Sequence, residues 1–129
     1  MKTINRLMIN LCSEKLTESK AFYTTLFNFN INYDSDWFIH LTSESQNLEL
    51  GIVDKNHETV PSHVQGKSDG FYLTFVVDNA DEVHEIAQNQ NMEVISAPED
   101  TFYGQRRLLL KDPNGVVVDV SSPIPNFGG

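Results

Sequence analysis

The 129-residue sequence has a single cysteine, Cys12, which excludes an internal disulfide and fits a reducing compartment. Basic residues are also scarce: nine Lys and Arg stand against eighteen Asp and Glu, which argues against a phosphate-backbone partner. No apolar run is long enough to span a bilayer, and polar Asn5 and Asn10 interrupt the apolar residues near the N-terminus, which argues against a signal peptide. We therefore expect a cytoplasmic protein that binds neither nucleic acid nor membrane.

The first half of the sequence contains a strand, a helix and three more strands. Residues 4–12 alternate between apolar and mixed positions, which predicts a strand. Thr17 is a suitable N-cap for a helix that buries Phe22 and Leu26. Three short β-like segments follow at residues 30–33, 36–42 and 47–53, and the polar residues 54–69 are expected to form a connecting loop.

The second half repeats this order. Residues 70–77 predict a strand, and a capping box at Asn79 opens a helix in which Val83, Ile86 and Ala87 face inward. Residues 92–97 predict a strand that residues 98–100 terminate. A unit that recurs after roughly 60 residues indicates an internal duplication, and 129 residues are enough for one domain with a sizeable core.

The most informative segment is residues 102–120, FYGQRRLLLKDPNGVVVDV. Pro113 suits the first corner of a tight turn, Asn114 tolerates the second, and Gly115 provides the left-handed exit. The apolar runs on either side are too short for helices. This segment therefore predicts a β-hairpin.

This hairpin resembles the last hairpin of the vicinal oxygen chelate superfamily, which includes glyoxalases, bleomycin-resistance proteins and extradiol dioxygenases. YGQR followed by DPNG is most similar to the antibiotic-binding branch, and LTESKAFYTTLFNFNI resembles the first helix of the superfamily. The resemblance implies an α+β fold of duplicated βαβββ modules, at about residues 4–53 and 70–121, whose curved mixed sheets surround a cleft with the helices outside. It also implies a single domain over residues 1–123, a tail at residues 124–129, and a homodimer.

Strand alternation assigns side chains to two faces of these sheets. The apolar set expected beneath the helices is Leu7, Ile9, Leu11, Leu48, Leu50, Phe71, Leu73, Phe75, Val118 and Val120. The opposite set is mixed, as a binding cavity requires, and comprises Met8, Asn10, Cys12, Glu49, Tyr72, Thr74, Val76, Val117 and Asp119.

Metal-dependent members of the superfamily hold a divalent ion with His and Glu at four strand positions. The resemblance carries these positions to Met8, Glu49, Tyr72 and Asp119, where neither histidine is retained. Methionine is a poor ligand for hard cations, and tyrosine would have to lose a proton, so we interpret the metal site as degenerate and expect no cofactor. The alternative is a divalent metal held by the two carboxylates.

Two carboxylates about 4 Å apart would repel by roughly 4 kcal/mol at an effective dielectric constant of 20. If Glu49 and Asp119 face each other, a metal, a shared proton, Arg106 or Arg107, or a cationic ligand must neutralise them. If they lie farther apart, each is hydrogen-bonded or solvated by itself.

Aromatic side chains complete the predicted ligand site. Trp37 and Tyr103 are expected to stack on a ligand, whereas Phe38 is expected to fill space between the sheets. The four histidines are expected to be isolated, and Cys12 to be a small hydrophobe rather than a nucleophile. The predicted ligand-binding residues are Met8, Asn10, Trp37, Glu49, Tyr72, Thr74, Tyr103, Arg106 and Asp119.

The residues leave three functions open. The first is a metal-free cleft that binds a small cationic or aromatic molecule by stacking and burial. The second is a metal-dependent glyoxalase-like lyase or isomerase, or a ring-cleaving dioxygenase, in which Glu49 and Asp119 hold the metal or one of them is a general base. The third is a regulatory module that uses the fold without small-molecule chemistry. The sequence does not decide between an enzyme and a binding protein, and it does not identify the ligand.

Overall fold

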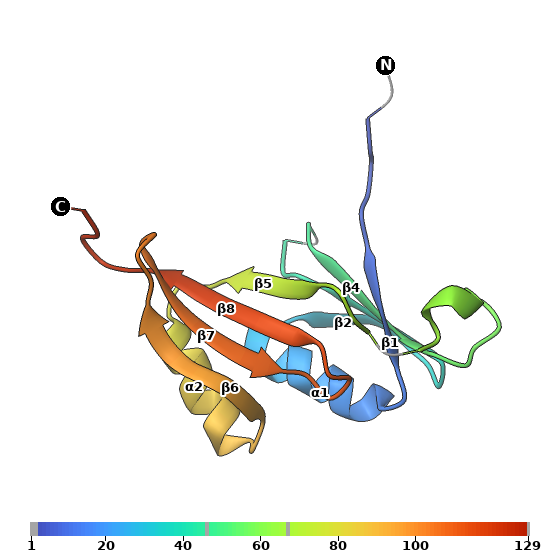
Figure 1. Ribbon diagram of the computed structural model, residues 1–129. Coiled ribbons are helices and arrows are strands. Elements are labelled where there is room, and N and C mark those ends of the chain that lie inside the picture. The colour runs from blue at the N-terminus through green and yellow to red at the C-terminus, as the bar shows by residue number, and fades with distance from the viewer. Residues whose placement is uncertain (1–2, 46, 67, 129) are drawn as a thin grey trace. The chain divides into compact units, whose positions relative to one another are not determined.

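A computed structural model describes residues 3–45, 47–66 and 68–128 of the protein and divides the chain into two compact units, Met1–Ser68 and Asp69–Gly129 (Figure 1). Each unit has the order βαβββ, so the predicted α+β class and its duplicated modules are confirmed. The first unit contains β1 (Ile9–Ser13), α1 (Leu16–Phe27), β2 (Asn30–Asp34), β3 (Phe38–Thr42), β4 (Glu49–Asp54) and the short 3₁₀ helix η1 (Ser62–Val64). The second contains β5 (Tyr72–Val76), α2 (Ala80–Asn89), β6 (Glu93–Asp100), β7 (Gln105–Lys111) and β8 (Val117–Pro123).

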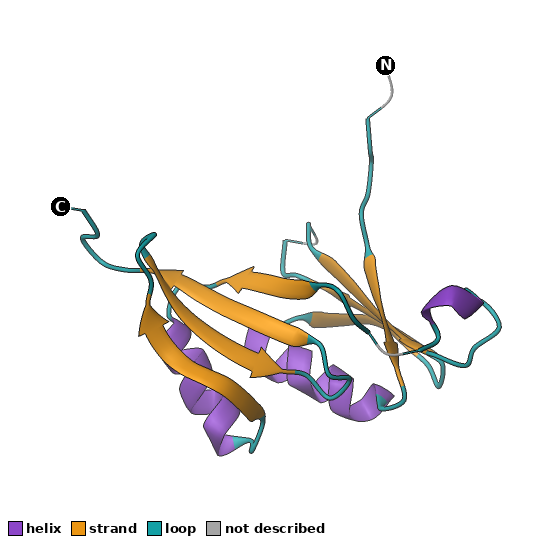
Figure 2. Ribbon diagram, in the orientation of Figure 1, coloured by secondary structure: helices purple, strands orange, loops and turns teal. Residues whose placement is uncertain are grey.

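Both units fold their strands into a mixed four-stranded sheet with the same topology (Figure 2). The strand order is β1-β4-β3-β2 in the first sheet and β5-β8-β7-β6 in the second. In each sheet the first strand of the unit runs parallel to the last, and the other neighbours are antiparallel. The last strand of each unit therefore lies inside its sheet, between two neighbours.

The core of the first unit lies between α1 and one face of its sheet. The register places Leu11 and Ile39 on either side of Ile52, and all three side chains are buried. Phe22 and Leu26 of α1 are buried as predicted. Each such side chain contributes roughly 1.5–3 kcal/mol through burial, so the hydrophobic effect decides which face of the sheet receives the helix.

The second unit buries the equivalent face beneath α2. Its largest buried set consists of Leu108, Leu110, Val116, Val118 and Val120, with Ala80, Val83 and Ala87 from α2. The predicted cap is confirmed, because the side-chain oxygen of Asn79 accepts from the backbone N–H groups of Asp81 and Glu82 at 2.9 and 3.2 Å.

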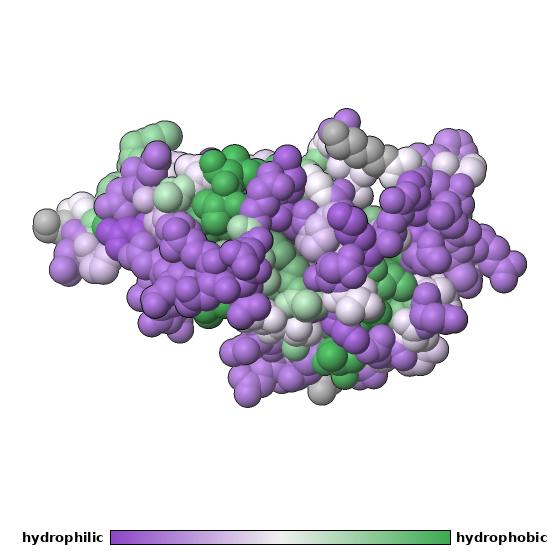
Figure 3. All heavy atoms as spheres, turned by 90° about the horizontal axis from the view of Figure 1, so that it is seen from below, coloured by the Kyte–Doolittle hydropathy of each residue, from purple (hydrophilic) through white to green (hydrophobic). Residues whose placement is uncertain are grey.

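Both helices are short and have polar outer faces. The surface in Figure 3 is accordingly mostly hydrophilic, with separate apolar patches. Within the described residues, neither helix has the length and apolar character needed to cross a membrane.

The hairpin turn has the predicted conformation. Asp112 and Val116 pair across it, and the N–H of Gly115 donates to the carbonyl of Asp112 at 3.1 Å. Gly115 has φ of +86°, a left-handed conformation that favours glycine. The buried carboxylate of Asp112 also accepts from the backbone N–H groups of Asn114 and Val116, so this side chain fixes the turn that joins β7 to β8.

Several predicted strand ends were wrong. Strand β1 begins at Ile9 rather than at residue 4, because its partner β4 begins only at Glu49 and offers no earlier ladder residue. Leu7, Leu48 and Phe71 consequently lie before the paired parts of their strands. Their side chains are 78, 63 and 45% exposed instead of being covered by helices.

Strand β6 continues through Pro98 to Asp100, where a break was predicted. The strand lies at the edge of its sheet and carries register shifts between Val94 and Glu99, so a residue without an N–H is tolerated there. Helix α1 also begins one residue before the predicted cap: Lys15 occupies the N-cap position and makes no side-chain capping bond. Ile86, predicted to face inward, is 37% exposed.

Candidate functional site

In the first unit the carboxylate of Glu49 is paired with Arg6, which precedes β1. The Nε atom of Arg6 donates to both carboxylate oxygens of Glu49 at 2.8 and 2.7 Å, and Nη2 also contacts Oε1. The Glu49 side chain is only 12% exposed, whereas that of Arg6 is 59% exposed. Hydrogen bonding from Arg6 is the main cause that lowers the pKa of Glu49 to about 2, so the carboxylate is ionised at neutral pH.

His40 on β3 makes a second contact with this carboxylate. Its Nε2 lies 2.7 Å from Oε1 of Glu49, and its Nδ1 lies 2.8 Å from the amide nitrogen of Asn32. With Nδ1 accepting from the Asn32 amide, Nε2 donates its N–H to the Glu49 carboxylate. The prediction that His40 is isolated was therefore wrong; the ring is oriented by hydrogen bonds at both nitrogens.

The residues at the expected metal positions of the first unit do not fit a metal site. Nη2 of Arg6 lies 3.8 Å from the sulfur of Met8 and also contacts Glu49, so a guanidinium occupies the space beside the carboxylate. A thioether is a soft donor, and Glu49 already binds a cationic group. No group of three or more His, Cys, Asp or Glu side chains with a geometry suited to metal binding occurs among residues 3–45, 47–66 and 68–128.

Next to this cluster, on the sheet face away from α1, lies a pocket of about 520 Å³. It is lined by Met8, Asn10, Cys12, Trp37, Phe38, Val53, Thr59, Val60, Pro61 and Val64. Three predicted ligand-binding residues, Met8, Asn10 and Trp37, are thus brought together, while Glu49 is not part of the lining. Burial raises the pKa of the Cys12 thiol, which favours its neutral form.

Aromatic rings hold one side of this pocket in place. The ring of Trp37 stacks on His57 with centroids 3.9 Å apart and an angle of 13° between the planes. Trp37 also packs against Phe38 at 5.5 Å. Nδ1 of His57 accepts from the backbone N–H of Thr59 at 3.2 Å. The stack therefore connects the β2–β3 turn to the loop after β4, which supplies the opposite wall.

In the second unit the carboxylate of Asp119 on β8 is 5% exposed and has its own set of partners. It accepts from the hydroxyls of Thr74 and Ser121 at 3.1 and 2.8 Å, and Nε of Arg107 lies 3.3 Å from Oδ2. The guanidinium of Arg107 lies 6.0 Å from the centroid of the Tyr72 ring. The predicted residues Tyr72, Thr74 and Asp119 therefore share one face of this sheet, where Arg107 neutralises the carboxylate.

Arg106, included in the predicted ligand set, precedes Arg107 on β7 and points to the opposite face of that strand. It donates to Asp100 at 2.7 Å and to Asp81 of α2 at 3.0 Å. These bonds, above all that to Asp100, raise the pKa of Arg106 further above its usual range. The predicted residue Tyr103 is 52% exposed and packs edge-on against Phe102.

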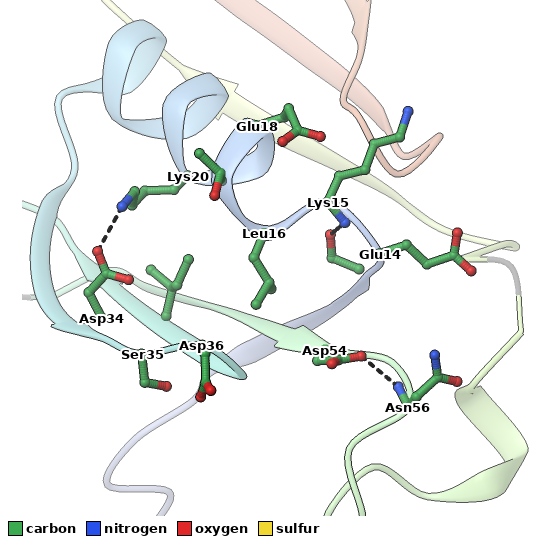
Figure 4. A pocket seen from close by; sticks show the side chains of 13 residues that line it. Glu14, Lys15, Leu16, Glu18, Lys20, Asp34, Ser35, Asp36, Asp54 and Asn56 are labelled. Atoms are coloured by element: carbon green, nitrogen blue, oxygen red, sulfur yellow. Dashed lines mark hydrogen bonds and ion pairs between the residues drawn. The ribbon is translucent and has the colours of Figure 1, made fainter.

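A separate, charged pocket of about 590 Å³ surrounds the start of α1 (Figure 4). Glu14, Glu18, Asp34, Asp36 and Asp54 line it together with Lys15 and Lys20. Lys20 donates to Asp34 at 2.7 Å, so part of this charge is already neutralised within the pocket. None of the predicted ligand-binding residues lies here.

A family model described as a glyoxalase-like domain matches residues 7–125. The chain belongs to this family. The match covers both units and confirms the resemblance to the vicinal oxygen chelate superfamily. No curated protein sequence matches this glyoxalase-like domain significantly.

Solved structures share the fold of this glyoxalase-like domain at low sequence identity. A glyoxalase/bleomycin resistance protein/dioxygenase family enzyme from Burkholderia phytofirmans is 21% identical with a TM-score of 0.76, covering 91% of this chain and 97% of its own. A glyoxalase/bleomycin resistance protein/dioxygenase from Nocardioides is 19% identical with a TM-score of 0.69, covering 98% of this chain and 89% of its own. A lactoylglutathione lyase from Agrobacterium tumefaciens is 17% identical with a TM-score of 0.68, covering 94 and 96%. At these identities the likeness shows the fold alone.

Sequence reasoning missed three members of the Glu49 cluster, namely Arg6, His40 and Asn32. The only signal for His40 was its alternation with Phe38, which places both on the face of β3 that carries the pocket. The only signal for Arg6 was its alternation with Met8 in the strand predicted at residues 4–12, and nothing in the sequence indicated its partner, which lies 43 residues away.

Proposed function

We propose that this glyoxalase-like domain is a binding protein that holds a small aromatic molecule without a catalytic metal. The proposal rests on one observation: the carboxylate of Glu49, at a metal-ligand position by resemblance, is saturated by Arg6 and His40. An internal guanidinium supplies the positive charge that a metal would otherwise supply. The neighbouring pocket, with a stacked tryptophan, provides a place for a ligand.

The second unit supports the same function. Asp119 accepts hydrogen bonds from two hydroxyls and forms an ion pair with the guanidinium of Arg107, so its charge is also neutralised internally. A general base must reach the proton it removes, and a carboxylate bound by an arginine is a weaker base than a free one. A metal-dependent lyase, isomerase or dioxygenase is therefore the less favoured alternative.

A thermal-shift screen tests the proposal. A panel of small aromatic compounds is added to protein purified without chelator, in parallel with and without EDTA. We expect at least one compound to raise the unfolding midpoint equally in both conditions, because a ligand that binds only the folded state stabilises it. A shift that requires added metal, or stoichiometric metal in the purified protein, would reverse the proposal.

Two matched variants locate the binding. Val64→Phe fills the pocket from a residue that is 53% exposed, and Val76→Phe makes the same change at a position of β5 that is 70% exposed. We expect Val64→Phe to reduce the ligand-induced shift and Val76→Phe to leave it unchanged. Equal effects would place the ligand outside this pocket.

The cellular location and the assembly remain proposals. A reducing, cytoplasmic compartment is supported by the single cysteine, Cys12. A homodimer is supported by the resemblance, and by exposed apolar residues such as Leu7 and Val76. Sedimentation equilibrium of the whole chain tests the dimer directly.

A further inference from the structure

We infer that the pocket beside Trp37 selects an uncharged, flat ligand with one hydrogen-bonding edge, rather than the cationic ligand that the acidic composition suggests. This inference rests on the proposed binding function and specifies its ligand class. Three features of the first unit carry it: a lining without a charged side chain, a neighbouring Glu49 carboxylate that is already bound by Arg6 and His40, and one amide in the lining that has no hydrogen-bond partner among the described residues.

Among the residues that the structure describes, the lining of the pocket includes no Asp, Glu, Lys, Arg or His side chain. Its one titratable group is the thiol of Cys12, which is neutral because burial raises its pKa. An ion placed among these side chains loses hydration without gaining a partner of opposite charge, which is a large cost. The formal charge of −9 therefore lies elsewhere and does not define this pocket.

The charged groups beside Met8 are engaged with one another. Glu49 is bound by Arg6 and His40. His57, which stacks on Trp37, accepts from the backbone N–H of Thr59 through Nδ1 and is not part of the lining. The Arg6–Glu49 pair therefore offers an unpaired counter-charge neither to a cationic nor to an anionic ligand. The other pocket of this unit, around the start of α1, contrasts sharply because carboxylates and lysines line it.

The shape of the pocket favours a planar molecule. Trp37 and Phe38 present aromatic surface, and Val60, Pro61 and Val64 form an aliphatic wall from the loop after β4. Rings stack on such surfaces with little loss of conformational freedom. A volume of about 520 Å³ falls in the range of small-molecule sites.

Two polar side chains, Asn10 and Thr59, interrupt this apolar lining, and the Thr59 hydroxyl already contacts Nδ1 of His57 at 2.9 Å. Asn10 is exposed and, among the described residues, its side-chain amide has no hydrogen-bond partner. It lies against Gly51, where an added Cβ would be only 2.2 Å from Oδ1 of Asn10. Glycine at position 51 therefore leaves the space that the Asn10 amide occupies. This amide provides both a donor and an acceptor for one edge of the ligand.

Three naphthalene compounds that differ only in their substituent test the inference. They are 2-naphthalenemethanol, which is neutral, 2-naphthylmethylamine, which is a cation at pH 7, and 2-naphthoate, which is an anion. Isothermal titration of the whole chain measures the three dissociation constants. We expect the neutral compound to bind at least about tenfold more tightly than either ion.

Variants that introduce a charge at Val64 test whether this ligand selectivity arises in the pocket. Val64→Glu is expected to improve binding of the cation by about tenfold, and Val64→Lys to improve binding of the anion to a similar degree. Val64→Gln is the uncharged control, and Ile31→Glu adds the same charge on the edge strand β2, outside the pocket lining. Both control variants are expected to bind the three compounds in the same order of affinity as the wild-type chain. Circular dichroism verifies that each variant is folded.

The outcomes separate the two proposals. Equal or tighter binding of either ion by the wild-type chain overturns the neutral-ligand inference and leaves the binding function intact. Neutral selectivity that does not respond to Val64→Glu or Val64→Lys also overturns it, because the selecting site then lies elsewhere. If none of the three compounds binds and the thermal-shift screen finds no ligand, both the inference and the proposed function are wrong.

Discussion

Arg6 and Glu49 form a bidentate ion pair, in which Nε of the arginine lies 2.7 Å from Oε2 and Nη2 contacts Oε1. Glu49 is the first residue of β4, and Arg6 lies three residues before β1, the strand that pairs with β4. The parallel pairing of these strands brings the arginine to the carboxylate. This glyoxalase-like domain thus carries its own cation, Arg6, beside Glu49, a residue that the resemblance places at a metal-ligand position.

Replacing the guanidinium of Arg6 by a metal-binding imidazole should create a metal site beside Glu49. The double variant Arg6→Ala with Met8→His removes the guanidinium and adds an imidazole near Glu49 and His40. We expect stoichiometric binding of Ni²⁺ or Zn²⁺ by isothermal titration, because two imidazoles and one carboxylate suit these ions. Arg6→Ala alone and the wild-type chain are the controls, and equally strong binding by either would contradict our interpretation of the cluster.

Glu49 should make stability depend on pH in a narrow acidic range. Its pKa falls from an ordinary value of 4.5 to about 2 on folding, so below pH 4.5 the unfolded chain binds the proton more readily. The stabilisation is therefore complete above about pH 5 and is lost as the pH falls toward 2. Urea unfolding of the wild type and Glu49→Gln from pH 2.5 to 6 should show a stability difference that grows with pH. A constant difference would show that Arg6 does not perturb this carboxylate.

The two neighbouring arginines of β7 should differ in their effect on stability. Arg107→Met leaves the buried carboxylate of Asp119 with only two hydroxyl partners, and we expect it to lower the free energy of unfolding by about 1–3 kcal/mol. Arg106→Met, which breaks exposed ion pairs with Asp100 and Asp81, should cost less.

Chemical denaturation of the single variants and of Arg107→Met with Asp119→Asn measures this difference. The double variant should recover part of the lost stability, because it removes the carboxylate charge as well as its partner. Equal losses in Arg106→Met and Arg107→Met would contradict the assignment of Arg107 to the buried pair.

The cap of α2 should contribute measurably to stability. Asn79→Ala removes the side-chain oxygen that accepts from two backbone N–H groups, and we expect a loss of about 1 kcal/mol. Asn79→Asp retains an acceptor at the same place and should be close to neutral. Thermal unfolding compares the two variants, and a similar loss in both would mean that the capping bonds are not the cause.

Much of the fold was accessible from the sequence because its signals are local. Period-two alternation identified the faces that carry Leu11 and Asn10, and Asp112 to Gly115 specified the hairpin turn. Strand ends were less accessible, since a strand ends where its neighbour stops pairing, as Ile9 shows. The prediction that a strand ends before Pro98 was wrong, because the adjacent residues in the sequence do not indicate that this strand lies at a sheet edge.

The sequence by itself determined which side chains alternate toward each face of a strand, because alternation is a property of an extended backbone. Only the tertiary structure decided how the carboxylates are neutralised. Glu49 takes its arginine from 43 positions away, and Asp119 takes Arg107 rather than Arg106, because strand register decides which of the two adjacent arginines shares its face. Side-chain charges interact through space, so their pairing depends on contacts between strands that no local pattern specifies.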